Sequence, residues 1–136
     1  MTSSLLQLVE IPQRGDARGS LSIVELGKTL PFTVKRAYWI HGTRPCVSRG
    51  YHAHRELRQL FCCLRGQVTL SVSDGLTKEE VVIQAFGQAA ILGPGLWRVM
   101  SNFSEDCILM VLADREYDEA DYIRDYEEFR RAKNHG

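Results

Sequence analysis

Short hydrophobic segments separated by polar residues run through most of the chain and predict β-strands. The clearest is residues 68–72, where Val68, Leu70 and Val72 alternate with polar neighbours, as in a strand with one buried face. Residues 59–64 are almost continuously apolar, which is typical of a strand buried on both faces. Apolar or β-branched composition predicts further strands at residues 21–25, 33–40, 81–83, 89–92 and 107–113.

Glycine, proline and aspartate residues separate these segments. Residues 14–19 predict a turn, residues 74–75 (Asp-Gly) close a hairpin, and residues 93–95 (Gly-Pro-Gly) form a tight turn, because these residue types adopt turn angles at low cost. Many short strands with regularly spaced turns are typical of an antiparallel barrel or sandwich.

The pattern changes near Asp118. From there Tyr122, Ile123, Tyr126 and Phe129 recur at spacings of three and four residues, with charged residues between them. This spacing is typical of an amphipathic helix, and Asp118 is a suitable N-cap. We therefore predict an all-β domain spanning residues 1–136 that ends in one helix, with both tyrosines on the buried face of that helix.

Composition excludes several classes of function. Seventeen basic and seventeen acidic residues cancel, so no overall charge attracts nucleic acid or an acidic membrane. The first residues have neither a basic start nor a long apolar run, so no signal peptide or membrane span is expected. The cysteines lack metal-type spacing and are interpreted as reduced core thiols of a cytoplasmic protein, with one disulfide as the alternative; they are Cys46, Cys62, Cys63 and Cys107.

The residues best suited to chemistry are two histidines, His52 and His54, which are followed by Gln59 and Gly66. On a strand, side chains two residues apart point to the same face, so both imidazoles can enter one cavity. The spacing resembles the first cupin signature, in which a His-x-His pair, an acidic residue and a later glycine line a small β-barrel. Here Gln59 stands at the acidic position.

A second cupin signature is also present in outline, in Gly87, residues 93–95, Arg98 and Asn102, with Arg98 at the position of the histidine. A catalytic metal normally has three protein ligands, and a guanidinium repels a divalent cation. We therefore expect no metal and no other cofactor. A metal-free histidine pair suits general acid–base catalysis, and nearby arginines suit phosphate binding. The alternative is a hydrogen-bonded histidine pair without a chemical role.

Four segments make a more specific match. Residues 18–129 resemble the sugar nucleotide 3,4-ketoisomerases that act on dTDP-4-keto-6-deoxyglucose. The match rests on residues 49–59, on Pro31-Phe32 with Lys35-Arg36 and Tyr38, on Gly93-Pro94 with Trp97, and on Tyr117-Asp118-Glu119 with Asp121-Tyr122-Ile123-Arg124. The last segment is distinctive, because generic cupins lack it.

The resemblance implies a cupin-type barrel and a homodimer that exchanges N-terminal strands. It implies a reaction that moves the carbonyl from C4 to C3 through an enediol and leads to 3-amino-3,6-dideoxy sugars of surface glycans such as lipopolysaccharide. It assigns catalysis to His52, His54 and Tyr38. It assigns the diphosphate to Arg36 and Arg49, and the other substrate contacts to Arg18, Gln59, Trp97 and Arg98.

Three questions stay open at this point. Within the family, arginine at the position of Arg18 resembles enzymes with a galacto product, whereas Arg98 resembles those with a gluco product, so the C4 configuration is undetermined. The residues also do not indicate which histidine acts first. Finally, a related 3,5-epimerase and a non-enzymatic sugar-binding module remain the alternative functions.

Overall fold

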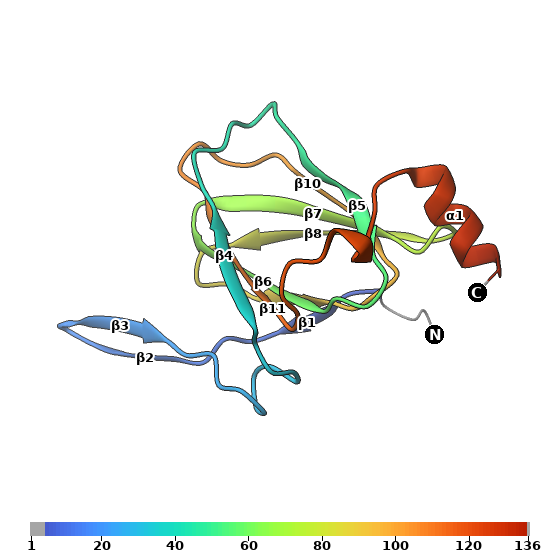
Figure 1. Ribbon diagram of the computed structural model, residues 1–136. Coiled ribbons are helices and arrows are strands. Elements are labelled where there is room, and N and C mark those ends of the chain that lie inside the picture. Colours follow the sequence, from blue (N-terminus) through green and yellow to red (C-terminus); the bar gives the residue numbers. More distant parts are fainter. Residues whose placement is uncertain (1–4, 136) are drawn as a thin grey trace.

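Two antiparallel β-sheets face each other in the computed structural model, which describes residues 5–135 (Figure 1). The first sheet has the strand order β1 (Gln7–Val9), β9 (Ala89–Leu92), β6 (Gln59–Arg65), β11 (Ile108–Ala113) and β4 (Arg36–Ile40). The second has the order β12 (Tyr122–Ile123), β5 (Arg49–His54), β10 (Trp97–Ser101), β7 (Gln67–Ser73) and β8 (Lys78–Gln84). The predicted cupin-type antiparallel barrel is confirmed.

The main core fills the space between the sheets. The inward side chains of β7, Val68, Leu70 and Val72, pack there with Phe61 of β6 and Leu109 of β11, as the alternating pattern predicts. The outer face of β6 is also covered, because Leu60 packs in a second cluster with the segment that contains Leu30 and Phe32. The strand is thus buried on both faces, which explains its continuous apolar sequence.

The C-terminal segment differs from the predicted helix. Asp118 caps a short 3-10 helix, η1 (Glu119–Asp121), rather than an α-helix. Tyr122 and Ile123 then form β12, which pairs with His54 and Ala53 of β5, and α1 begins only at Tyr126 and ends at His135. The helical prediction was wrong for Tyr122 and Ile123, because pairing with β5 satisfies their backbone groups in an extended conformation.

A hairpin of β2 (Gln13–Asp16) and β3 (Gly19–Ser22) projects away from the two sheets (Figure 1). It contains the predicted turn, but the strand expected over residues 21–25 ends at Ser22. Every residue of the two strands is exposed. The hairpin therefore contributes nothing to the core of its own chain.

The remaining predictions concern cysteines and termini. All four cysteines are free thiols, and only Cys63 and Cys107 are buried, whereas Cys62 is half-buried and Cys46 is exposed. The description of Cys46 as a core thiol was wrong. Within residues 5–135, no helix is long and apolar enough to cross a membrane. The expectation about a leader falls mainly on residues 1–4, which lie outside the described residues.

Candidate active site

A cavity of about 580 Å³ opens between β4 of the first sheet and β5 of the second. Its walls carry basic and aromatic side chains, chiefly those of Arg36, Tyr38, Arg49, His52, Tyr122 and Arg124. Arg36 and Tyr38 reach it together because alternate residues of β4 point to one face.

The two histidines lie on the inner face of β5. His52 is paired in register with Arg98 of β10, and His54 with Tyr122 of β12. The imidazole centroids of His52 and His54 are 4.9 Å apart and the rings are perpendicular. His52 lines the cavity, whereas His54 is 1% exposed and lies behind it. The predicted convergence of both rings on one face is confirmed.

Both imidazoles are held in the neutral form. Burial lowers the pKa of His52 from its ordinary value of 6.5 to about 4. Burial also lowers the pKa of His54, and the positive charge of Arg98 acts in the same direction. Near neutral pH each ring therefore has one nitrogen that can accept a proton.

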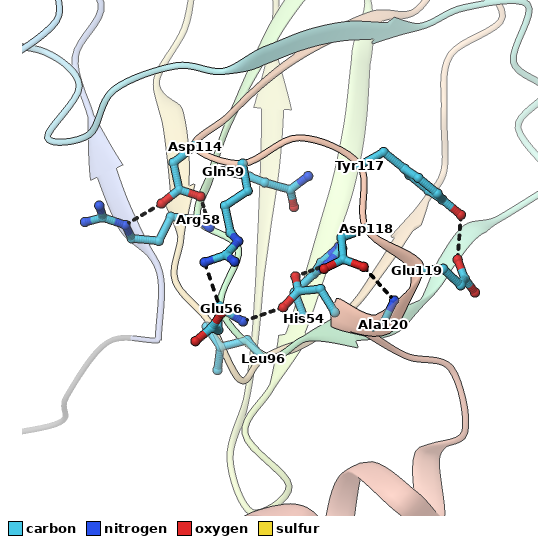
Figure 2. Close-up of polar contacts among 12 residues, drawn as sticks. His54, Glu56, Arg58, Gln59, Leu96, Asp114, Tyr117, Asp118, Glu119 and Ala120 are labelled. Carbon is cyan, nitrogen blue, oxygen red and sulfur yellow. Dashed lines mark hydrogen bonds and ion pairs between the residues drawn. The ribbon is translucent and has the colours of Figure 1, made fainter.

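An aspartate that we did not identify from the sequence fixes the orientation of His54. Asp121 Oδ2 lies 3.0 Å from His54 Nδ1, and its Oδ1 accepts a hydrogen bond of 2.8 Å from the backbone N–H of Glu56. Asp121 ends η1, and Asp118 caps this short helix by accepting a hydrogen bond from the backbone N–H of Ala120 (Figure 2). The carboxylate accepts a hydrogen bond from Nδ1–H, so Nε2 is the nitrogen that is left to accept a proton.

Tyr122 is a second residue of the site that the sequence analysis did not recognise. Its ring centroid lies 4.3 Å from that of His54 and 5.0 Å from that of His52. It was assigned to the buried face of a helix, but on β12 it packs directly against both imidazoles. The signal was present in the distinctive Tyr117–Arg124 segment, which we used only to recognise the family.

Arg98 and Gln59 are buried against each other. The Arg98 side chain donates to Gln59 Oε1 and, at 3.0 Å, to the backbone carbonyl of Leu96. Gln59 Nε2 in turn donates a 3.0 Å hydrogen bond to the Tyr38 hydroxyl. Burial lowers the pKa of Arg98 to about 10, which leaves it cationic at neutral pH. Arg98 does not line the cavity, and Gln59 joins it to the cavity-lining Tyr38.

The donor set around the histidines does not suit a metal ion. Among the described residues, no three His, Cys, Asp or Glu side chains are grouped as ligands. Gln59, at the cupin acidic position, is occupied by Arg98 and Tyr38. A buried guanidinium beside the imidazoles would also repel a divalent cation.

Three arginines on the cavity wall are suited to bind an anion. Arg36 has a buried Nε without a hydrogen-bond partner, and its guanidinium lies 5.6 Å from the Tyr38 ring centroid. Arg49 lies at the start of β5. Arg124, which the sequence did not single out, lies 4.1 Å above the Tyr122 ring and pairs with Glu119 at 2.8 Å.

A polar cluster at the cavity mouth holds Glu119 in place. Its carboxylate accepts a hydrogen bond of 2.5 Å from the Tyr117 hydroxyl, as Figure 2 shows. Arg124 and Tyr117 lower the pKa of Glu119 to about 2 through these hydrogen bonds. The Arg124 guanidinium is thus held at the edge of the cavity by an ionised partner.

Two predicted substrate contacts lie elsewhere in the chain. Trp97 is on the outer face of β10, because Arg98 and Met100 take the inner face, and its ring packs against Tyr126 at 5.1 Å between centroids. Arg18 lies at the tip of the β2–β3 hairpin, where its side chain is 91% exposed and paired with Asp16. Neither residue lines the cavity of its own chain.

Comparison with known proteins gives a consistent result. A family model described as WxcM-like, C-terminal matches residues 4–134. A TDP-4-oxo-6-deoxy-alpha-D-glucose-3,4-oxoisomerase of Aneurinibacillus thermoaerophilus is 41% identical over 116 residues, which are 85% of this chain and 84% of the relative.

Two solved structures share the fold over nearly their whole length. A 3,4-ketoisomerase from Helicobacter canadensis is 37% identical with a TM-score of 0.92, over 95% of this chain and 97% of that one. The ketoisomerase QdtA from Thermoanaerobacterium thermosaccharolyticum, a histidine variant in complex with TDP-4-keto-6-deoxyglucose, is 30% identical with a TM-score of 0.93, over 98% and 97%. The chain thus belongs to the WxcM-like family of dTDP-4-keto-6-deoxyglucose 3,4-ketoisomerases.

Proposed function

We propose that the chain is a metal-independent 3,4-ketoisomerase that converts dTDP-4-keto-6-deoxyglucose into a dTDP-3-keto-6-deoxyhexose. The observation that carries this proposal is the cavity itself, which places a neutral imidazole, His52, among three arginines. A nucleotide-linked ketosugar needs both features, a base for the sugar and cations for the diphosphate.

The chemistry requires two proton transfers at neighbouring carbons. The C4 ketone acidifies the C3 proton, a base removes it, and the C4 oxygen gains a proton as the C3=C4 double bond forms. The resulting enediol then loses the proton of its C3 hydroxyl and gains one at C4, which leaves the carbonyl at C3. C3 is oxidised as C4 is reduced, so the isomerisation is redox-neutral and needs no redox cofactor.

We assign the abstraction of the C3 proton to His52, because it is the imidazole on the cavity wall. His54 acts with it from behind, oriented by Asp121, and completes the acid–base pair. Tyr38 lies on the opposite wall and supplies a hydroxyl group to the sugar oxygens. Under this proposal His52 is the histidine that acts first, because it is the one that the cavity exposes to a bound sugar.

Arg36, Arg49 and Arg124 are assigned to the diphosphate. An arginine binds phosphate oxygens through charge-assisted hydrogen bonds, and the buried Nε of Arg36 has no protein partner to lose. The position of these arginines around His52 would orient the sugar toward the imidazole.

The exposed β2–β3 hairpin supports a homodimer in which this segment reaches a second copy. Both strands of the hairpin are exposed, with Leu21 at 57%, so a second copy of the chain would find this surface uncovered. In such a dimer Arg18 would approach the cavity of the other subunit and could influence the configuration at C4. We further propose that the whole chain acts as one domain, in the cytoplasm, in the synthesis of 3-amino-3,6-dideoxy sugars for surface glycans.

The decisive experiment is product NMR in deuterium oxide with a chelator present. The proposal predicts a 3-keto product with deuterium at C4, and the coupling constants of the C4 proton made in ordinary water give its configuration. Exchange at C3 and C5 with the ketone still at C4 would instead identify an epimerase, and binding without exchange would identify a sugar-binding module. Strict dependence on added zinc or iron would contradict the metal-free mechanism.

A further inference from the structure

The glutamine at the cupin acidic position joins a buried arginine to a cavity-lining tyrosine. Arg98 donates to Gln59 Oε1, and Gln59 Nε2 lies 3.0 Å from the Tyr38 hydroxyl. Arg98 and Gln59 are 1% and 2% exposed, so water does not compete for these contacts. None of the ion pairs within residues 5–135 includes Arg98, so its guanidinium is hydrogen-bonded to neutral acceptors and the Asp121 carboxylate acts on it only at longer range.

The hydrogen bonds from Arg98 through Gln59 to Tyr38 allow only one arrangement of donors and acceptors. A guanidinium can only donate, so the Gln59 amide must turn its oxygen toward Arg98. The amide nitrogen then faces Tyr38 and can only donate, so the phenol oxygen must accept. Within the described residues the hydroxyl has no other hydrogen-bond partner. The proton of Tyr38 is consequently free to point into the cavity.

We propose that Gln59 is a positioning residue that, held by Arg98, makes Tyr38 a hydrogen-bond donor to the sugar oxygen that becomes negatively charged as the enediol forms. This inference deepens the proposed function and rests on it. Arg98 polarises the Gln59 amide, and the amide stabilises the negative charge that develops on the Tyr38 oxygen. The positive charge of Arg98 therefore stabilises the substrate through this series of hydrogen bonds.

The same logic explains why the residue is glutamine rather than the glutamate of metal-binding cupins. A carboxylate at this position would accept a hydrogen bond from the Tyr38 hydroxyl, whose proton would then point away from the cavity. Burial also raises the pKa of Tyr38, so the phenol keeps its proton near neutral pH and is able to donate it in a hydrogen bond. Ala113, which is paired in register with both Arg36 and Gln59, is small enough to leave room between the two strands.

The sharpest test is the Q59E variant, because it changes one atom type and keeps the shape. The new carboxylate pairs with Arg98, so the proposal predicts an equal or higher melting temperature together with a fall in kcat of about 10- to 100-fold. The kcat of Y38F should fall by a similar factor, and the kcat of Y38F/Q59E should be no lower than that of Y38F alone. The matched control is Q84E at the end of β8, where the side chain is exposed, and we expect its kcat and melting temperature to be unchanged. All assays contain chelator, because Q59E places a carboxylate near two imidazoles.

The outcomes separate the two proposals. Unchanged kcat in Q59E, or an equal loss of rate in the wild-type and Y38F backgrounds, would overturn the role of Gln59. If the wild-type protein does not isomerise the sugar at all, the proposed function fails. The hydrogen bonds from Arg98 through Gln59 to Tyr38, called here the relay, are then tested by titrating the Tyr38 hydroxyl. Subtracting the tyrosinate absorbance of Y38F from that of the wild type, and of Y38F/Q59E from that of Q59E, isolates the titration of Tyr38. We expect the pKa of Tyr38 to be higher in Q59E than in the wild type. An unchanged or lower pKa would contradict the relay.

Discussion

His54 Nδ1 and Asp121 Oδ2 lie 3.0 Å apart, and both side chains are buried. The two residues are 67 positions apart in sequence and meet because β12 pairs with the end of β5. The contact selects one imidazole tautomer, with the proton on Nδ1. The C-terminal segment of this chain thus does more than close the barrel, since it orients one of the two histidines.

The Asp121→Asn substitution tests that orientation. An asparagine amide can turn its NH₂ toward Nδ1, which moves the imidazole proton to Nε2 and removes the free acceptor. We expect kcat to fall by roughly 10²–10⁴-fold, the usual size of a general acid–base contribution, with little change in KM. Asp125→Asn at the start of α1 is the control, because asparagine can also cap Glu128 there. A rate like that of the wild type would show that the tautomer of His54 does not matter.

The lowered pKa of His52 predicts activity under acid conditions. If neutral His52 is the base, kcat/KM should stay level as the pH falls through the ordinary histidine value of 6.5 and decline only as it nears 4. The pH profile with dTDP-4-keto-6-deoxyglucose measures this directly. A decline centred near 6.5 would show that His52 titrates as if exposed.

The same shift makes a prediction about stability. The folded state holds His52 neutral, whereas the unfolded chain protonates it near 6.5, so its contribution to stability is complete above 6.5 and is lost as the pH falls toward 4. Replacing His52 by asparagine should therefore reduce the loss of unfolding free energy between pH 7 and pH 5 by up to about 2 kcal/mol. Urea denaturation of both proteins at the two pH values gives the comparison, and equal losses would contradict the shift.

The sequence predicted the site better at its centre than at its edges. His52 and His54 were placed correctly, because a two-residue spacing on a strand leaves one geometry. Gln59 and Arg98 were recognised as replacements for metal ligands. Their mutual hydrogen bond was not foreseen, since signature spacing tells which residues face inward but not whether they touch the ligand or each other.

At the edges of the site the local sequence pattern is not enough to place the residues, because long-range pairing decides where they lie. Tyr122 and Ile123 fit a helical spacing as well as a two-residue strand, and only the long-range pairing with β5 decides between them. Trp97 alternates with Arg98 along β10 and so faces outward, which the Gly93-Pro94 motif with Trp97 did not show by itself. The position of Arg18 depends on where the hairpin goes, which no local pattern encodes.

Arg124 offers a test of substrate binding. If it meets the diphosphate, Arg124→Gln should raise KM by about 10-fold or more and leave kcat nearly unchanged, because a contact kept from ground state to transition state affects binding alone. Arg130→Gln, on the exposed side of α1, is the control for loss of one positive charge. An unchanged KM in Arg124→Gln would mean that its pairing with Glu119 is purely structural.

At Gly50, β5 lies so close to β10 that no side chain fits between the two strands. Its φ of 102° lies in the region that favours glycine, and a Cβ there would come within 2.9 Å of the Arg98 carbonyl oxygen. Gly27 has a φ of 82° but open space around it, so Gly27→Ala carries the backbone strain without the collision. We expect Gly50→Ala to reduce the free energy of unfolding by about 1–3 kcal/mol more than Gly27→Ala.

The two glycine variants also connect stability with the site. The collision would separate β5 from β10 at the pairing of His52 with Arg98, so Gly50→Ala should lower kcat even at temperatures where it is fully folded. Gly27→Ala should keep the wild-type kcat under the same conditions. Thermal denaturation and initial rates measure the two effects separately. Equal losses of stability in the two variants would show that β10 can move aside, and the close approach at Gly50 would then not be what sets His52 in place.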